Sequence, residues 1–190
     1  MIVVRMIWFS LCLIWIVAEV KLARSNRIDH ADLSEKEDRS QRILWITILV
    51  SLLFALIFKT LALIPIQIDY LPRQIIGLFL FAAGLALRYI AVHKLGRLFT
   101  TNVSIHNEHR LIADGPYRWI RHPAYTGLIM AMTGAGLAMG DYIAILILLA
   151  PTIGVFNYRI AIEEKLLINK FGQIYLDYSN QTKKLLPWVF

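Results

Sequence analysis

Long uninterrupted apolar runs constrain this chain more than any other feature of its sequence. Residues 2–22, 43–64 and 75–92 each approach or exceed the length that crosses a bilayer core, which is about 20 residues. Two shorter runs, 126–139 and 142–156, are separated only by Gly140-Asp141, a pair typical of a tight turn, and predict a helical hairpin. Because lipid offers a backbone no hydrogen-bond partner, each run is expected to be helical. The sequence therefore predicts an all-α integral membrane bundle of five transmembrane helices.

Composition supports one membrane domain over residues 1–190, with three spans in residues 1–92. The chain is 58% apolar and only 17% charged, whereas soluble domains are about 25% charged. The single cysteine, Cys12, excludes a disulfide framework and a cysteine-based zinc site. A net charge of +7 invites comparison with nucleic-acid-binding proteins, but the basic residues lie between apolar runs and form no soluble patch. We therefore expect no nucleic-acid partner.

The polar stretches 23–42, 93–125 and 159–190 should all lie on one side of the membrane, because five spans alternate in direction. Of the 20 Lys and Arg residues, only Arg5, Lys59 and Arg73 fall nearer the other side. Positively charged residues mark the cytoplasmic face. The sequence thus predicts a multi-pass protein whose polar segments meet at the cytoplasm, in the cell membrane if the host is a prokaryote. A turn is expected at residues 69–73.

Several polar groups in these stretches could carry chemistry, and each also has a structural interpretation. The turn-rich segment 106–125 could present donors to a ligand or be a plain interfacial loop with aromatic and arginine anchors. His106 and His109 have a spacing usable for a metal, but no third ligand is obvious, so we expect no metal. Arg159 and Glu163 share a helix face, as a salt-bridged helix end or as two charges in one pocket. The small residues of 133–140 are typical of close helix packing.

Taken together, three motifs resemble a known family. They are Gly115-Pro116-Tyr117-x-x-x-Arg121-His122-Pro123-x-Tyr125-x-Gly127, then Glu163-Glu164, then Phe171-Gly172-x-x-Tyr175-x-x-Tyr178. In this order the chain resembles the isoprenylcysteine carboxyl methyltransferases and related phospholipid methyltransferases, in particular a short prokaryotic (archaeal or bacterial) member. The resemblance covers residues 93–190, which would be the catalytic region.

The resemblance implies S-adenosylmethionine as cofactor, S-adenosylhomocysteine as product, and a lipid-like or prenylated methyl acceptor reached from the bilayer. It implies that Arg159 faces the acceptor carboxylate and that Glu163, with Glu164 beside it, completes the cofactor pocket. Arg121 is expected to organise that pocket or to pair with an anion. The other expected cofactor contacts are His106, His109, Arg110, Leu111, Ile112, Tyr117, His122, Pro123, Ala124 and Tyr125.

The physical chemistry of the implied reaction agrees with these residue types. A cofactor with an amine and a carboxylate needs both an acidic partner and cationic donors. Methyl transfer to a carboxylate requires alignment and exclusion of water but no general base. Three alternatives stay open: methylation of a phospholipid amine, a nicotinamide-dependent membrane reductase of the sterol type, and a non-enzymatic scaffold.

Overall fold

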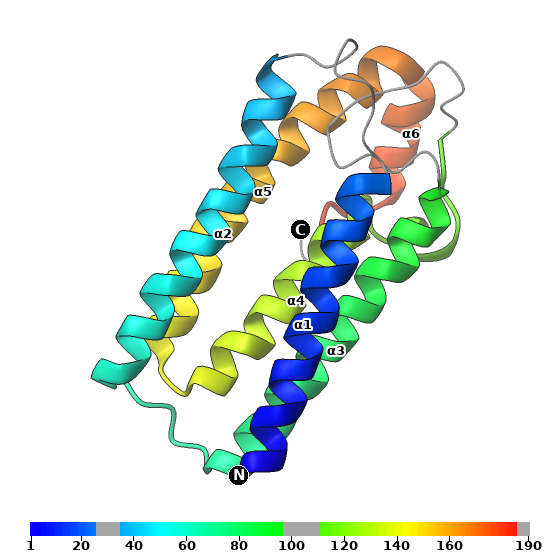
Figure 1. Ribbon diagram of the computed structural model, residues 1–190. Helices are drawn as coiled ribbons and strands as arrows, with labels where there is room; N and C mark the ends of the chain where they lie inside the picture. Colours follow the sequence, from blue (N-terminus) through cyan, green and yellow to red (C-terminus); the bar gives the residue numbers. More distant parts are fainter. Residues whose placement is uncertain (26–34, 97–110, 186–190) are drawn as a thin grey trace.

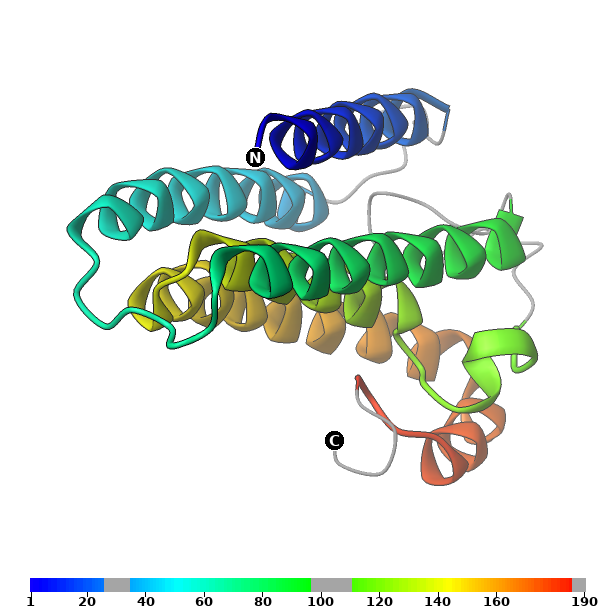
Figure 2. The ribbon, with the colours of Figure 1, turned by 90° about the horizontal axis from the view of Figure 1, so that it is seen from below.

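A computed structural model describes residues 1–25, 35–96 and 111–185, and every regular element in these ranges is helical. Five long helices lie side by side and alternate in direction (Figure 1, Figure 2). The elements are α1 (Ile2–Ser25), α2 (Glu35–Leu61), α3 (Tyr70–Leu95), the 3-10 turn η3 (Gly115–Arg118), α4 (Pro123–Met139), α5 (Tyr142–Phe171) and α6 (Gln173–Gln181). The predicted all-α class is confirmed.

Four of these helices are long and apolar enough to cross a membrane: α1, most of α2, α3 and α5. Helix α4 has 17 residues, a length of about 26 Å at 1.5 Å per residue. It lies between α3 and α5 in the same bundle (Figure 1). The chain is thus an integral multi-pass membrane protein, and the count of five spans stays a prediction.

One predicted boundary was wrong. The turn expected at residues 69–73 is mostly helix, because α3 already begins at Tyr70 and holds Pro72 in its first turn, where a missing N–H leaves no helical bond unmade. Helix α5 includes Pro151 and extends beyond the apolar run 142–156 to Phe171, over 30 residues. Its length of about 45 Å exceeds the roughly 30 Å bilayer core. The last turns of α5 therefore lie beyond the membrane-crossing part of the helix, at the polar end of the molecule.

Helices α3 and α4 pack closely through two pairs of glycines. A Cβ atom on Gly84 would lie 2.4 Å from the carbonyl oxygen of Gly127, and one on Gly127 would lie 2.5 Å from that of Gly84. Gly77 and Gly134 repeat this reciprocal arrangement one heptad away, at 2.7 and 2.4 Å. The close packing predicted for residues 133–140 is confirmed at Gly134, because only glycine lets two helix backbones approach this far.

The end of the bundle that carries the N-terminus is held by Asp141. As predicted, Gly140 and Asp141 form the turn between α4 and α5, and Gly140 adopts a left-handed conformation with φ of 85°. The buried Asp141 carboxylate caps α5 by accepting hydrogen bonds from the backbone N–H groups of Ile143 and Ala144. It also accepts one from Ile64 at 2.8 Å, which fastens the α2–α3 connection to the hairpin.

The opposite end of the bundle gathers the polar parts of the chain, as the alternation of spans predicted. The end of α1, the start of α2, the end of α3, η3, the start of α4, the end of α5 and α6 all lie there (Figure 1). Residues separated by more than a hundred positions thereby become neighbours. This end holds the candidate site.

Candidate active site at the polar end of the bundle

A short backbone pairing positions the Arg-His-Pro segment before α4. The backbone N–H of Lys183 donates to the carbonyl of Trp119 at 3.1 Å, and Arg121 N–H donates to the Lys183 carbonyl at 2.8 Å. His122 N–H donates to the carbonyl of Lys184 at 3.1 Å. These bonds satisfy backbone groups that precede the helix and hold the side chains of Arg121 and His122 toward α5.

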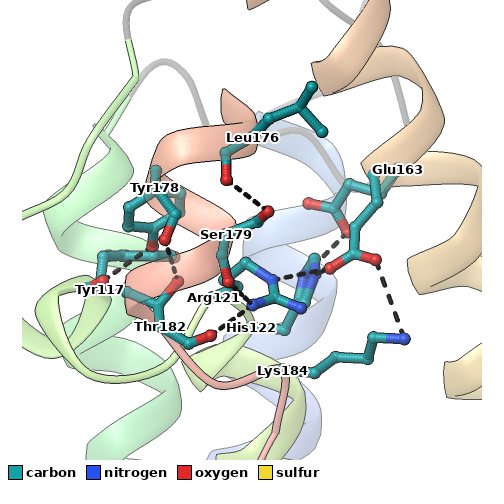
Figure 3. A network of polar contacts seen from close by, with 10 residues as sticks. Tyr117, Arg121, His122, Glu163, Leu176, Tyr178, Ser179, Thr182 and Lys184 are labelled. Atoms are coloured by element: carbon teal, nitrogen blue, oxygen red, sulfur yellow. Dashed lines mark hydrogen bonds and ion pairs between the residues drawn. The ribbon is translucent and has the colours of Figure 1, made fainter. Parts of the chain in front are cut away.

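Arg121 joins three elements in the network drawn in Figure 3. Its Nε atom lies 2.9 Å from Oε1 of Glu164, and its Nη1 atom donates to the carbonyl oxygens of Ser179 and Thr182. One planar guanidinium therefore ties the start of α4 to the end of α5 and to the end of α6. This arrangement uses the fixed fork geometry that distinguishes arginine from lysine.

His122 is 4% exposed and lies between the two glutamates of α5. Its Nε2 atom is 3.3 Å from Oε1 of Glu164, and its Nδ1 atom is 3.6 Å from Oε2 of Glu163. Burial alone would lower the pKa of His122, but the hydrogen bond with Glu164 and the negative charges of Glu163 and Glu164 outweigh it and raise this pKa above 6.5. The two carboxylates thus stabilise the imidazolium form of His122.

This raised pKa predicts that the protein loses stability as the pH rises. The contribution of protonated His122 is fully present below its unfolded pKa of 6.5 and disappears as the pH rises through its higher folded value. We expect the thermal midpoint of the detergent-purified protein to fall from pH 6 to pH 9, and to fall less in His122→Gln. The exposed His93 supplies the control variant His93→Gln, which should keep the wild-type slope. Equal slopes in all three proteins would contradict the assignment.

The two neighbouring glutamates have different surroundings. Glu164 contacts three cationic groups, since Lys184 Nζ lies 3.9 Å from its Oε2 atom in addition to the contacts with Arg121 and His122. Oε2 of Glu163 is buried but accepts no hydrogen bond from the described residues, because His122 at 3.6 Å is too distant. A buried carboxylate oxygen without a donor is costly and fits a site completed by a cationic ligand.

Arg159 lies one turn before Glu163 on α5 and is 3% exposed. Its Nε atom is 3.4 Å from the Tyr125 hydroxyl, and its Nη1 atom is 3.3 Å from Oγ of Ser40 on α2. The ring of Tyr125 in turn packs against Phe156, with centroids 5.0 Å apart. Sequence reasoning missed Ser40, because a serine 119 positions away from its partner leaves no local signal.

Tyr117, Ala124 and Ile112 meet in one apolar cluster with Ala91 and Val92 of α3. The Tyr117 hydroxyl donates to the carbonyl of Ala91 at 3.4 Å, and its own carbonyl accepts from the hydroxyl of Tyr178 at 2.7 Å (Figure 3). The 3-10 turn is thereby fastened both to α3 and to α6.

The structure thus places most of the predicted site residues at one end of the bundle. Pro123 and Ala124 are buried in the first turn of α4, and Leu111 is half-buried. His106, His109 and Arg110 lie outside the described residues, so their assignment stays a prediction. In the described part of the chain no group of three or more His, Cys, Asp or Glu side chains is arranged to hold a metal.

The fold and the site define an integral membrane protein whose helix ends surround a buried arginine, a histidine and two carboxylates. A family model described as the isoprenylcysteine carboxyl methyltransferase (ICMT) family matches residues 75–169, which is half of the chain. The chain belongs to this family. The matched region contains Tyr117, Arg121, His122 and both glutamates, and it ends before α6.

Similar proteins in other organisms agree with this membership. The chain is 32% identical to the protein-S-isoprenylcysteine O-methyltransferase of Saccharomyces cerevisiae over 117 residues, covering 60% of this chain and 49% of the yeast protein. It is 31% identical to a probable protein-S-isoprenylcysteine O-methyltransferase of Oryza sativa subsp. indica, covering 64% of each. The chain therefore spans about half to two thirds of the length of these relatives.

A solved structure supports the same fold. The structure of the eukaryotic intramembrane Ras methyltransferase ICMT aligns with a TM-score of 0.55 and 26% sequence identity. The alignment covers 85% of this chain and 55% of that one. The structural similarity thus extends beyond the half of the chain that the family model matches.

Proposed function

We propose that this protein is an S-adenosylmethionine-dependent methyltransferase that esterifies the carboxylate of a lipid-like acceptor, of which a C-terminal prenylated cysteine is the type. Family membership and the names of the relatives support the reaction class. The observation that carries the proposal is a buried carboxylate oxygen on Glu163 that accepts no hydrogen bond from the described residues, with the buried Arg159 one helical turn away. One helix face thus offers a partner for a ligand cation and a partner for a ligand anion.

The residues present fit the cofactor. Oε2 of Glu163 can accept hydrogen bonds from the amine, and charge-assisted bonds of this type are among the stronger ones in proteins. Tyr117 and the first turn of α4 would form the neighbouring wall, and His106, His109 and Arg110 remain predicted contacts. When bound, S-adenosylmethionine would supply a methyl group on a positively charged sulfur; a carboxylate oxygen can attack that methyl carbon directly, with S-adenosylhomocysteine as the leaving group.

Arg159 would hold the acceptor carboxylate in line with that methyl group. Tyr125 and Ser40 contact its guanidinium and restrict its orientation, which lowers the entropy lost when an acceptor binds. The attacking carboxylate is already ionised, so this chain needs no side chain to remove a proton. Arg121 and Glu164 act as positioning residues, because they brace α4 against α5 and α6.

The acceptor would approach from the bilayer, and its charged end would reach the polar end of the bundle. Nearly all lysines and arginines belong to the segments that gather at that end of the bundle. Positive charge marks the cytoplasmic side of a membrane protein. We therefore place the site at the cytoplasmic face.

The proposal predicts saturable binding of S-adenosylhomocysteine that depends on Glu163. We expect calorimetric titration of the detergent-purified protein to show about 10- to 100-fold weaker binding for Glu163→Gln, because a charge-assisted hydrogen bond becomes a neutral one. Asp177→Asn removes the same charge from an exposed position on α6 and should bind like the wild type.

Two further titrations separate this proposal from the alternatives. Binding of NADPH without binding of S-adenosylhomocysteine would identify a reductase, and binding of neither by a folded sample would leave a scaffold. A methyl product released by mild alkali identifies an ester and excludes methylation of a phospholipid amine.

A further inference from the structure

Tyr175, on α6, is a buried polar residue to which the proposed function assigns no task. It is 2% exposed, and its hydroxyl has no hydrogen-bond partner among the described residues. Buried hydroxyl groups in proteins are nearly always hydrogen-bonded, because losing water without gaining a partner is unfavourable. A buried hydroxyl without a partner therefore indicates that a group outside the described residues forms a hydrogen bond with it in the working protein.

Tyr178, three residues later on α6, is a half-buried tyrosine whose hydroxyl does have a hydrogen-bond partner within the protein. The two rings lie 5.9 Å apart, but the Tyr178 hydroxyl donates to the carbonyl of Tyr117 at 2.7 Å. One tyrosine of α6 thus completes a contact within the protein, and the other does not. The pair provides a natural comparison of two phenols on the same helix.

The surroundings of Tyr175 identify the kind of group it would meet. Tyr175 lies on α6, and Arg121 of the ion network donates to two carbonyl groups at the end of that helix, those of Ser179 and Thr182. Burial and the charges of Glu164 and Glu163 raise the pKa of the Tyr175 phenol. Three buried side-chain atoms lack a hydrogen-bond partner in the described part of the chain, and two of them, Glu163 Oε2 and the Tyr175 hydroxyl, lie at the polar end of the bundle. A ligand that satisfies both would carry a cationic donor for the carboxylate and an acceptor for the hydroxyl.

We propose that the Tyr175 hydroxyl donates a hydrogen bond to the carboxylate of the amino-acid end of the cofactor while Glu163 accepts from its amine. This inference rests on the proposed function, because it assumes that S-adenosylmethionine occupies the site. The amino-acid end is the part of that molecule in which an ammonium and a carboxylate flank a single carbon atom. Its two charges match the two unsatisfied atoms, whereas the uncharged adenosine end does not require a charged neighbourhood.

The test compares Tyr175→Phe with Tyr178→Phe in two measurements. In calorimetric titration, Tyr175→Phe should bind S-adenosylhomocysteine about tenfold more weakly than the wild type, the effect of one hydrogen bond to a charged group. The same variant should bind the decarboxylated analogue of S-adenosylhomocysteine as the wild type does, because that probe lacks the accepting carboxylate. In thermal unfolding without ligand, Tyr175→Phe should keep or raise the midpoint, since it removes an unsatisfied buried hydroxyl, and Tyr178→Phe should lower it.

Each other outcome overturns the inference in a recognisable way. Unchanged binding of S-adenosylhomocysteine by Tyr175→Phe, with Glu163→Gln still weakened, refutes the role of Tyr175 and leaves the proposed function standing. Equal weakening for both probes shows that the hydroxyl does not contact the carboxylate. A midpoint lowered as much as in Tyr178→Phe shows that the hydroxyl stabilises the fold. A wild-type protein that binds neither probe refutes the proposed function, and the inference fails with it.

Discussion

Replacing Arg159 with lysine is expected to reduce kcat/KM for methyl transfer by about 10²- to 10³-fold, because disrupting the geometry of a buried contact between charged groups costs about 3–4 kcal/mol. Lysine keeps the positive charge but loses the planar fork that can meet both oxygens of an acceptor carboxylate. The readout is base-labile methyl ester formed on N-acetyl-S-farnesylcysteine from methyl-labelled S-adenosylmethionine. The affinity for S-adenosylhomocysteine should stay within a few-fold of the wild type, because Glu163 and Tyr117 are unchanged.

The Arg159 variant separates acceptor binding from cofactor binding. Arg159 also contacts Tyr125 and Ser40, so a variant with normal cofactor affinity and a normal thermal midpoint is required before its activity is interpreted. Ser40→Ala should lose activity by a smaller factor, since it removes only one contact that orients the guanidinium. Near wild-type activity in Arg159→Lys would show that the acceptor carboxylate is bound elsewhere.

Replacing Gly127 with valine is expected to disrupt the bundle. A Cβ atom there would lie 2.5 Å from the Gly84 carbonyl oxygen and 2.7 Å from the Arg88 backbone nitrogen. Backbone atoms of a packed helix cannot move aside as a flexible side chain does, so α3 and α4 must separate. We expect a loss of about 3 kcal/mol or more, measured as a thermal midpoint lowered by about 10 °C.

Gly154 supplies the matched control. It lies on α5, and a Cβ atom there would meet nothing within 4 Å. Gly154→Val makes the same chemical change and should move the midpoint by less than half as much as Gly127→Val does. Similar losses in both variants would show that the cost comes from placing a β-branched residue in a helix and not from close approach.

The effect of Gly127 should reach the site, because the same packing orients the start of α4. Gly127 follows His122 by five residues, and its backbone neighbour Arg88 belongs to an ion pair with Glu19 of α1 at 2.6 Å. Separating α3 from α4 therefore disturbs both the histidine between the two carboxylates and the attachment of α1. Any Gly127→Val protein that folds should also bind S-adenosylhomocysteine more weakly.

The sequence by itself determined the class of the protein and which segments meet. Lengths of apolar runs predict membrane helices because the free energy of transfer into lipid and the internal hydrogen bonds of a helix are local properties. Counting spans then placed residues 93–125 and 159–190 at one end, which the structure confirms for the parts of both segments that it describes. The apolar run ends at Phe156, but the amphipathic sequence after it, including Arg159 and Glu163, continues the same helix to Phe171.

Only the tertiary structure decided which polar atoms are satisfied. In the sequence Glu163 and Glu164 are equivalent neighbours, and so are the tyrosines at 175 and 178. The fold gives Glu164 three cationic partners, whereas no described residue donates a hydrogen bond to Oε2 of Glu163. Within the same described ranges, the hydroxyl of Tyr178 has a hydrogen-bond partner and that of Tyr175 has none. Whether a donor reaches an acceptor depends on angstrom-scale packing between elements far apart in the chain, as with Arg159 and Ser40. Helix formation depends on residues that are neighbours along the chain, so the sequence predicts it. A binding site depends on how separate helices pack against one another, so only the tertiary structure shows it.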